Sequence, residues 1–67
     1  MNILINGNVK VFNVANLTIA GLVTELDLAA KRLAIEKNGE IVPRSQFADV
    51  TLQEGDKLEI VGAVGGG

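Results

Sequence analysis

The sequence ends in three consecutive glycines, Gly65, Gly66 and Gly67, directly after a largely apolar segment, residues 58–64. Glycine has no side chain and adopts backbone conformations closed to other residues, so such an end can enter a narrow channel in another protein. The reactive group that it offers is the carboxylate of Gly67. Glycine-rich ends also occur where a terminus has no function, and the rest of the sequence must decide between these interpretations.

Four residue types that often carry catalysis or metal binding are absent. The sequence contains no Cys, His, Tyr or Trp. The common zinc ligand sets therefore cannot form, and the usual general bases and activated nucleophiles are missing. The composition predicts that the chain is not an enzyme, has no catalytic residue or metal site, and binds no cofactor of its own.

Charge and hydropathy exclude two further classes of partner. The formal net charge is −2, the six basic residues are scattered, and the only aromatic residues are two phenylalanines, so we expect no nucleic-acid binding. No apolar run approaches membrane-spanning length, and the first apolar run, residues 3–5, is too short for a secretory signal. We therefore expect no membrane partner, and a cysteine-free chain fits the cytoplasm.

Two Asn-Gly pairs each separate two short apolar runs, which is a strong sequence signal for a β-hairpin. The first hairpin is predicted from residues 3–5 and 9–14, and the second from residues 33–37 and 40–42. Pro43 ends the second hairpin because it has no amide hydrogen to donate to a sheet. After it we expect a single helical turn that places Phe47 over one end of the core, and then a final strand at residues 57–63.

One helix is predicted between the hairpins. Ile19, Leu22, Val23 and Leu26 recur at the spacing that places them on one side of a helix. Thr18 precedes them and is a suitable N-cap, because its hydroxyl can accept a hydrogen bond from an amide of the first turn. Leu17 is expected to pack against Leu22.

A single helix can cover one face of a sheet only, so the sequence predicts an α+β domain of two layers. Strand alternation assigns a set of aliphatic residues to the covered face. They are Ile3, Ile5, Leu33, Ile35, Leu58 and Ile60, to which we add Phe12 and Val14 from the second strand. The residues left on the open face are Leu4, Val9, Val11, Val61 and Ala63. If their strands are neighbours, these residues form a contiguous apolar contact surface beside the glycines.

Taken together, these elements resemble the β-grasp fold of ubiquitin and its small prokaryotic relatives. The sequence is most similar to the ThiS-type sulfur carriers of thiamin biosynthesis, a family related to the small subunits of molybdopterin synthase. Three stretches carry the resemblance: Met1 to Gly7; Asn38-Gly39-Glu40-Ile41-Val42-Pro43-Arg44 with Phe47; and residues 55–61 leading into Ala63-Val64-Gly65-Gly66-Gly67. It implies one β-grasp domain, residues 1–63, with a mixed sheet of four to five strands, and a flexible C-terminal tail, residues 64–67.

The resemblance also implies a function. In this family the terminal carboxylate is adenylated by a ThiF-type activating enzyme that uses ATP, sulfur from a persulfide donor replaces the adenylate, and the thiocarboxylate passes sulfur to a ThiG-type thiazole synthase. The sequence agrees, because a carboxylate is a poor electrophile that needs activation and this chain has no phosphate-binding Gly-x-x-x-x-Gly-Lys loop. Activation must therefore come from a partner.

Residue roles follow from the same resemblance. Gly67 carries the reactive carboxylate, Gly66 is the second residue in the partner's channel, and Gly65 extends the reach of the tail. Leu4, Val61, Ala63 and Val64 are candidate partner contacts. Three alternatives stay open: a sulfur carrier for molybdopterin or for tRNA thiolation, a ubiquitin-like protein modifier that uses the same glycine, and an adaptor whose glycines are inert.

Overall fold

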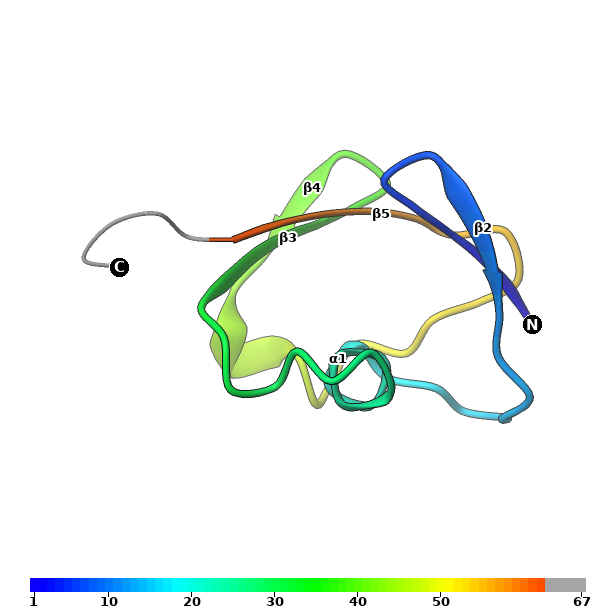
Figure 1. Cartoon of the computed structure of the whole chain (residues 1–67), viewed down its shortest axis with the longest axis horizontal. Coiled ribbons are helices and arrows are strands. Elements are labelled where there is room, and N and C mark those ends of the chain that lie inside the picture. Colours follow the sequence, from blue (N-terminus) through cyan, green and yellow to red (C-terminus); the bar gives the residue numbers. More distant parts are fainter. Residues whose placement is uncertain (63–67) are drawn as a thin grey trace.

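The structure is a computed structural model that describes residues 1–62, in which a five-stranded sheet packs on one short α-helix (Figure 1). In chain order the elements are β1 (Asn2–Ile5), β2 (Asn8–Val11), α1 (Ile19–Glu25), β3 (Leu33–Lys37), β4 (Glu40–Val42), the 3-10 helix η1 (Arg44–Gln46) and β5 (Lys57–Gly62). The predicted order of elements and the two-layer α+β architecture are confirmed. Ala63, the predicted last residue of the final strand, lies outside the described residues.

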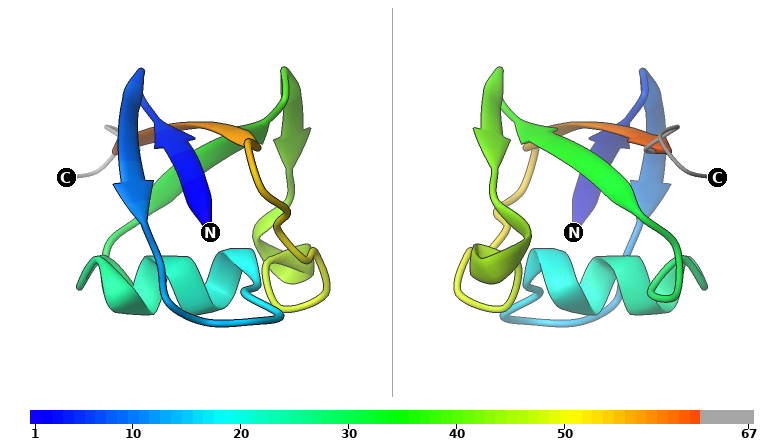
Figure 2. Two further views of the ribbon diagram at one scale, coloured as in Figure 1. Left: turned by 90° about the vertical axis from the view of Figure 1, so that its right-hand side faces the viewer. Right: turned by 90° about the vertical axis from the view of Figure 1, so that its left-hand side faces the viewer.

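The sheet has the strand order β2-β1-β5-β3-β4, so that β5, the last strand of the chain, is the central strand. β5 is parallel to β1 and antiparallel to β3, which makes the sheet mixed. The hairpins β1–β2 and β3–β4 lie on either side of β5, and α1 lies across one face of all of them (Figure 2).

Both hairpins turn at the predicted Asn-Gly pairs. Asn6 and Gly7 have φ angles of 50° and 83°, and Asn38 and Gly39 have φ angles of 51° and 88°. Two successive positive φ angles define a type I′ turn, whose twist matches the twist of the paired strands. Asparagine and glycine are the residues that tolerate these angles best, which explains why the chain folds back at these two points.

Helix α1 is short, and both of its ends are capped. At its start the Thr18 Oγ1 accepts a hydrogen bond from the Gly21 amide at 3.0 Å, as predicted. At its end Asp27 takes a positive φ of 59°, and the amides of Asp27 and Leu28 donate to the carbonyls of Thr24 and Val23 at 3.0 and 2.9 Å. This pair of bonds is a Schellman motif, here with aspartate in place of the usual glycine. A helix of seven residues needs such caps and its packing to be stable.

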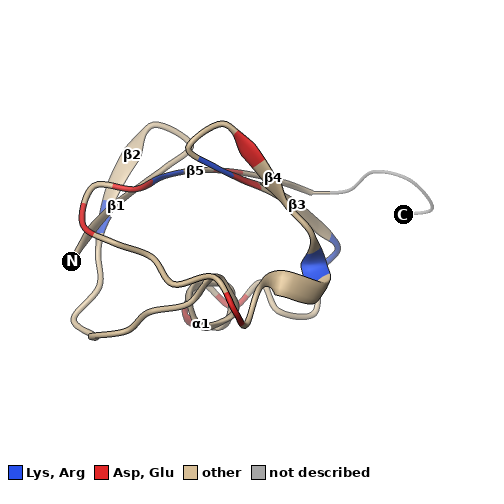
Figure 3. Cartoon of the chain, turned by 180° about the vertical axis from the view of Figure 1, so that it is seen from behind, with Lys and Arg blue, Asp and Glu red and all other residues tan. Residues whose placement is uncertain are grey.

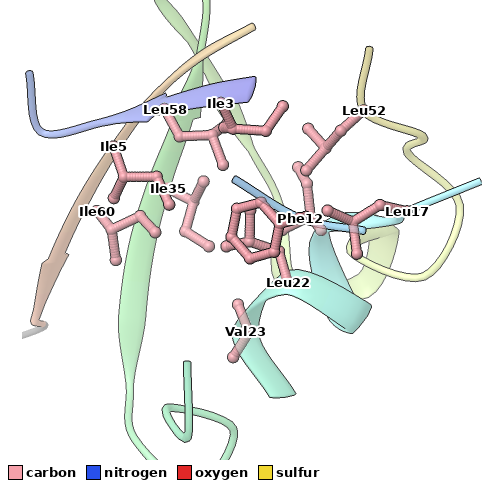
Figure 4. Packing of buried hydrophobic residues seen from close by; sticks show 11 residues of the cluster. Ile3, Ile5, Phe12, Leu17, Leu22, Val23, Ile35, Leu52, Leu58 and Ile60 are labelled. Carbon is pink, nitrogen blue, oxygen red and sulfur yellow. The ribbon is translucent and has the colours of Figure 1, made fainter. Parts of the chain in front are cut away.

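The core lies between α1 and the covered face of the sheet (Figure 4). Its buried members are Ile3, Ile5, Phe12, Leu17, Ile19, Leu22, Val23, Ile35, Leu52, Leu58 and Ile60. Leu33 and Phe47 are partly buried and pack against this cluster. All the predicted inward residues except Val14 are therefore confirmed, including Phe47, which follows η1.

Val14 is the exception among the residues predicted to face inward, because 46% of its surface is exposed. β2 ends at Val11, so the chain has left the sheet before it reaches this residue. Alternation predicts the side on which a residue lies only while the strand continues. Phe12 is buried because it follows the strand directly and its amide donates to the carbonyl of Met1 at 2.8 Å.

Candidate functional site

Most of the residues predicted to carry function lie beyond the end of β5. Ala63, Val64, Gly65, Gly66 and Gly67 are all outside the described residues. The structure does define the strand that precedes them, and it places the two remaining predicted contacts, Leu4 and Val61. The candidate site is therefore built from the C-terminal half of β5 and the residues that hold it.

The two neighbours of β5 contact it over different lengths. β3 pairs with β5 as far as Gly62, the last residue of β5, which lies opposite Leu33. β1 pairs with β5 at two positions only, Leu4 with Lys57 and Ile5 with Leu58, because the chain turns away after Ile5. Within residues 1–62, β5 beyond Leu58 therefore has a strand on the β3 side only.

The side chain of Asn6 occupies the place where β1 stops. Its Nδ2 donates to the carbonyl oxygen of Ile60 at 2.9 Å, and its Oδ1 accepts from the Ile60 amide at 2.8 Å. The backbone amide of Asn6 also donates to the Leu58 carbonyl at 2.9 Å. Asn6 thus completes the regular β1–β5 pairing at Leu58 through its backbone amide, and through its side chain it holds β5 at one further point, Ile60. The Asn-Gly pattern predicted the turn, but it gave no sign of these side-chain bonds.

Asn38, at the corresponding position of the second hairpin, holds the opposite end of β5. Its Oδ1 accepts from the Lys57 amide at 3.0 Å, and its own amide donates to the Lys57 carbonyl at 2.8 Å. Its Nδ2 donates to Oδ1 of Asp56 at 3.1 Å. The two turn asparagines therefore fix the start and the later part of the central strand.

Val61 lies on the open face of the sheet, and 57% of its surface is exposed. Ala34 lies directly opposite it on β3, and Ile41 on β4, which is 76% exposed, lies opposite Glu36 on the same face. Glu36 in turn lies opposite Glu59. We call Ala34, Ile41 and Val61 the Val61 patch. The paired carboxylates of Glu36 and Glu59 lie between Val61 and Ile41 on this face.

Leu4 does not lie beside Val61, contrary to the expected single apolar surface. The strands are neighbours, but their register pairs Leu4 with Lys57, four positions before Val61. Leu4 is partly buried and lies opposite Val9, close to the exposed Val11. The apolar residues of the open face therefore form two groups, one on β1 and β2 and the other around Val61.

The charged groups of residues 1–62 are dispersed over the fold. The lysines and arginines occur in β2, before β3, at the end of β3, in η1 and at the start of β5, and they do not gather on one face (Figure 3). Within this part of the chain no three acidic side chains are grouped so that they could hold a metal ion. None of its helices has the length and apolar character that crossing a bilayer requires.

Two hairpins around a central strand, with one helix across a single face, define a ubiquitin-like β-grasp domain. Comparison with protein families identifies which β-grasp domain it is. The model of the ThiS family matches residues 3–67, almost the entire sequence, and the chain therefore belongs to the ThiS family.

A solved structure supports this assignment. The chain is similar to the thiamine biosynthesis protein ThiS from Geobacter metallireducens, with 33% identity, full coverage of both chains and a TM-score of 0.85. The similarity extends over the whole mixed sheet and its helix, which confirms the β-grasp fold.

Two sequence relatives differ in length. The chain is 45% identical over 67 residues to a thiazole synthase of Paramagnetospirillum magneticum, covering 100% of this chain and 20% of that protein. The chain thus spans about a fifth of the length of that relative. It is also 37% identical to the uncharacterized protein ycf40 of Porphyra purpurea, covering 98% of this chain and 94% of the relative.

Proposed function

We propose that this protein is a sulfur carrier that supplies sulfur for thiazole formation in thiamin biosynthesis. A carboxylate oxygen of Gly67 attacks the α-phosphorus of ATP on a ThiF-type activating enzyme, and pyrophosphate leaves. The terminal sulfur of a persulfide donor attacks the acyl carbon, and AMP leaves. A thiol of a partner protein then attacks the donor's sulfur in the acyl disulfide. A disulfide forms between that thiol and the donor, and a thiocarboxylate is left on Gly67. A ThiG-type thiazole synthase takes sulfur from this group.

The observation that carries this proposal is membership of the ThiS family over residues 3–67. The Geobacter metallireducens structure adds support, because its printed name places it in thiamine biosynthesis and its fold is shared over the whole chain. The thiazole synthase relative supports the choice of acceptor, since a segment 45% identical to this chain is part of a protein of that name. A carrier and an enzyme that share one polypeptide commonly act in the same reaction sequence.

In the proposed function, this chain presents its C-terminus and the partner proteins catalyse the reactions. Residues 1–63 act as the folded domain and residues 64–67 as the tail, in which Gly65 and Gly66 allow Gly67 to reach the partner's reaction centre. Val61, with Ala63 and Val64 after it, contacts the activating enzyme, and Leu4 belongs to a separate apolar group on β1. The partner binds ATP and supplies the catalytic residues, and the reactions take place in the cytoplasm.

The test is the intact mass of the protein after incubation with a ThiF-type activating enzyme, ATP and a persulfide donor. We expect a mass increase equal to the exchange of one oxygen for one sulfur, located by fragmentation at Gly67. Gly67→Ala is the matched variant: it keeps a terminal carboxylate, but its methyl group must enter a channel suited to glycine, so we expect poor conversion. An unshifted mass for the wild-type chain, under conditions that convert an established ThiS protein, contradicts the proposal.

A further inference from the structure

In the part of the chain that the structure describes, the later part of β5 has a strand on only one side. On the β3 side, pairing continues through Ala34 opposite Val61 and Leu33 opposite Gly62. On the β1 side, strand pairing ends at Ile5 and Leu58. The amide and carbonyl of Ile60 point to the side where β1 has ended, since both bond to the Asn6 side chain. These two backbone groups need partners, because a buried amide or carbonyl without a hydrogen bond destabilises the fold, and Ile60 is buried.

The carboxamide of Asn6 supplies both partners. A carboxamide offers a donor and an acceptor in one plane, which is the pattern that a peptide group presents. With bonds of 2.9 and 2.8 Å to Ile60, it takes the place of the next peptide group of β1. The hydrogen-bonding pattern between β1 and β5 is thereby continued to Ile60, although β1 itself ends at Ile5.

Val61 follows Ile60 directly, and Gly62 is the last residue of β5. Fixing Ile60 on both sides therefore fixes the exit of the strand from the sheet and the orientation of the Val61 patch. Without the Asn6 bonds, the end of β5 is held by β3 alone and can pivot about that single line of contacts.

We infer that Asn6 is a positioning residue for the activation of the Gly67 carboxylate. It fixes the point and direction in which the chain leaves the sheet, so that docking through the Val61 patch delivers the terminus to the partner's reaction centre. This inference rests on the proposed sulfur-carrier function. Positioning of this kind acts on the bound complex, because misplacement of a reacting group lowers the fraction of complexes in reactive geometry.

Asn38 provides an internal control. It occupies the same position of the same type of turn, with a φ of 51° against 50° for Asn6, and also bonds the β5 backbone through its Oδ1. It acts at Lys57, the start of the strand, far along β5 from Gly62. Asn6→Ala and Asn38→Ala therefore impose the same turn penalty and differ in which end of β5 they release.

The experiment compares Asn6→Ala, Asn6→Asp and Asn38→Ala in full-length protein, at a temperature where circular dichroism shows each to be folded. Asn6→Asp keeps the turn and an acceptor for the Ile60 amide, but places a second oxygen against the Ile60 carbonyl. We expect both Asn6 variants to lower kcat of adenylation about tenfold with little change in KM, and to speed amide exchange at Ile60 and Val61 about tenfold. Asn38→Ala is expected to keep wild-type kcat.

The possible results distinguish failure of the positioning role of Asn6 from failure of the proposed sulfur-carrier function. Wild-type kcat in Asn6→Asp, or an equal loss of kcat in Asn6→Ala and Asn38→Ala, overturns the positioning role while the carrier function stands. Failure of the wild-type chain to be adenylated contradicts the proposed function and the positioning role together. Unchanged exchange at Ile60 in both Asn6 variants contradicts the anchoring of β5, whatever the activity.

Discussion

The two faces of the sheet differ in composition and in how closely their side chains are packed. The face under α1 contributes Ile3, Ile5, Ile35, Leu58 and Ile60, all buried. The open face places Glu36 and Glu59 opposite each other between the exposed Val61 and Ile41. Close packing constrains the covered face in shape and volume, whereas substitutions on an exposed face usually change stability little. We therefore expect that contacts with partners can be changed in this domain without loss of folding, and the following substitutions test that expectation.

The largest effect is expected from the covered face. Ile35 is 1% exposed and lies in the middle of β3. Ile35→Ala should lower the free energy of unfolding by about 2–5 kcal/mol, because it loses buried apolar contacts and leaves a cavity. Urea denaturation measures the change, with Glu36→Gln, on the opposite face of the same strand, as the control expected to stay within about 0.5 kcal/mol. Similar losses of unfolding free energy in the two variants would show that the two faces do not differ in their contribution to stability.

Substitutions on the open face are expected to affect activation by the partner enzyme more than stability. Val61→Asp is expected to leave the fold intact and to raise KM for adenylation about tenfold, because a charge enters the proposed contact with the activating enzyme. Val11→Asp is its matched control, since Val11 is 65% exposed on the same face but lies in β2 at the edge of the sheet. Steady-state kinetics with varied carrier concentration measures both. If Val11→Asp is the more harmful change, docking occurs through the β1–β2 group instead.

A smaller loss of stability is expected at the start of α1, the helix that packs on the covered face. Thr18→Ala removes the acceptor of the Gly21 amide and should cost about 1 kcal/mol of stability. Thr24→Ala serves for comparison: Thr24 is an exposed helix residue whose Oγ1 donates to the Ala20 carbonyl, so alanine there should be neutral or slightly stabilising. Thermal unfolding of the two variants distinguishes them, and an equal shift in Tm would refute the capping role.

Local sequence patterns were sufficient to predict most of the fold. The two Asn-Gly turns, the Thr18 cap and the inward residues of β1, β3 and β5 all depend on neighbours within a few positions, and the structure confirms them. The error at Val14 arose because nothing in its own neighbourhood marks the end of β2 at Val11.

The register of β1 against β5 could not be predicted in this way. It depends on contacts between residues more than fifty positions apart, in which the Gly55 amide donates to the Asn2 carbonyl at 2.8 Å and the Asn2 amide donates to Glu54 Oε1 at 2.9 Å. Hydrophobic periodicity contains no information on that offset, which is why Leu4 was expected beside Val61. The same limit applies to Asn6, whose turn is local but whose side-chain partner, Ile60, is distant in sequence.

In the proposed carrier function, sulfur travels on the carboxylate of Gly67, and its path can be followed with a sulfur isotope. The persulfide donor is prepared with a heavy sulfur isotope, and the carrier is incubated with the activating enzyme, ATP and thiazole synthase with its other substrates. We expect the label first at the C-terminus of the carrier and then in the thiazole product, with both signals lost in a variant shortened by Gly66 and Gly67. Labelled thiazole formed equally well with the shortened variant would contradict the account.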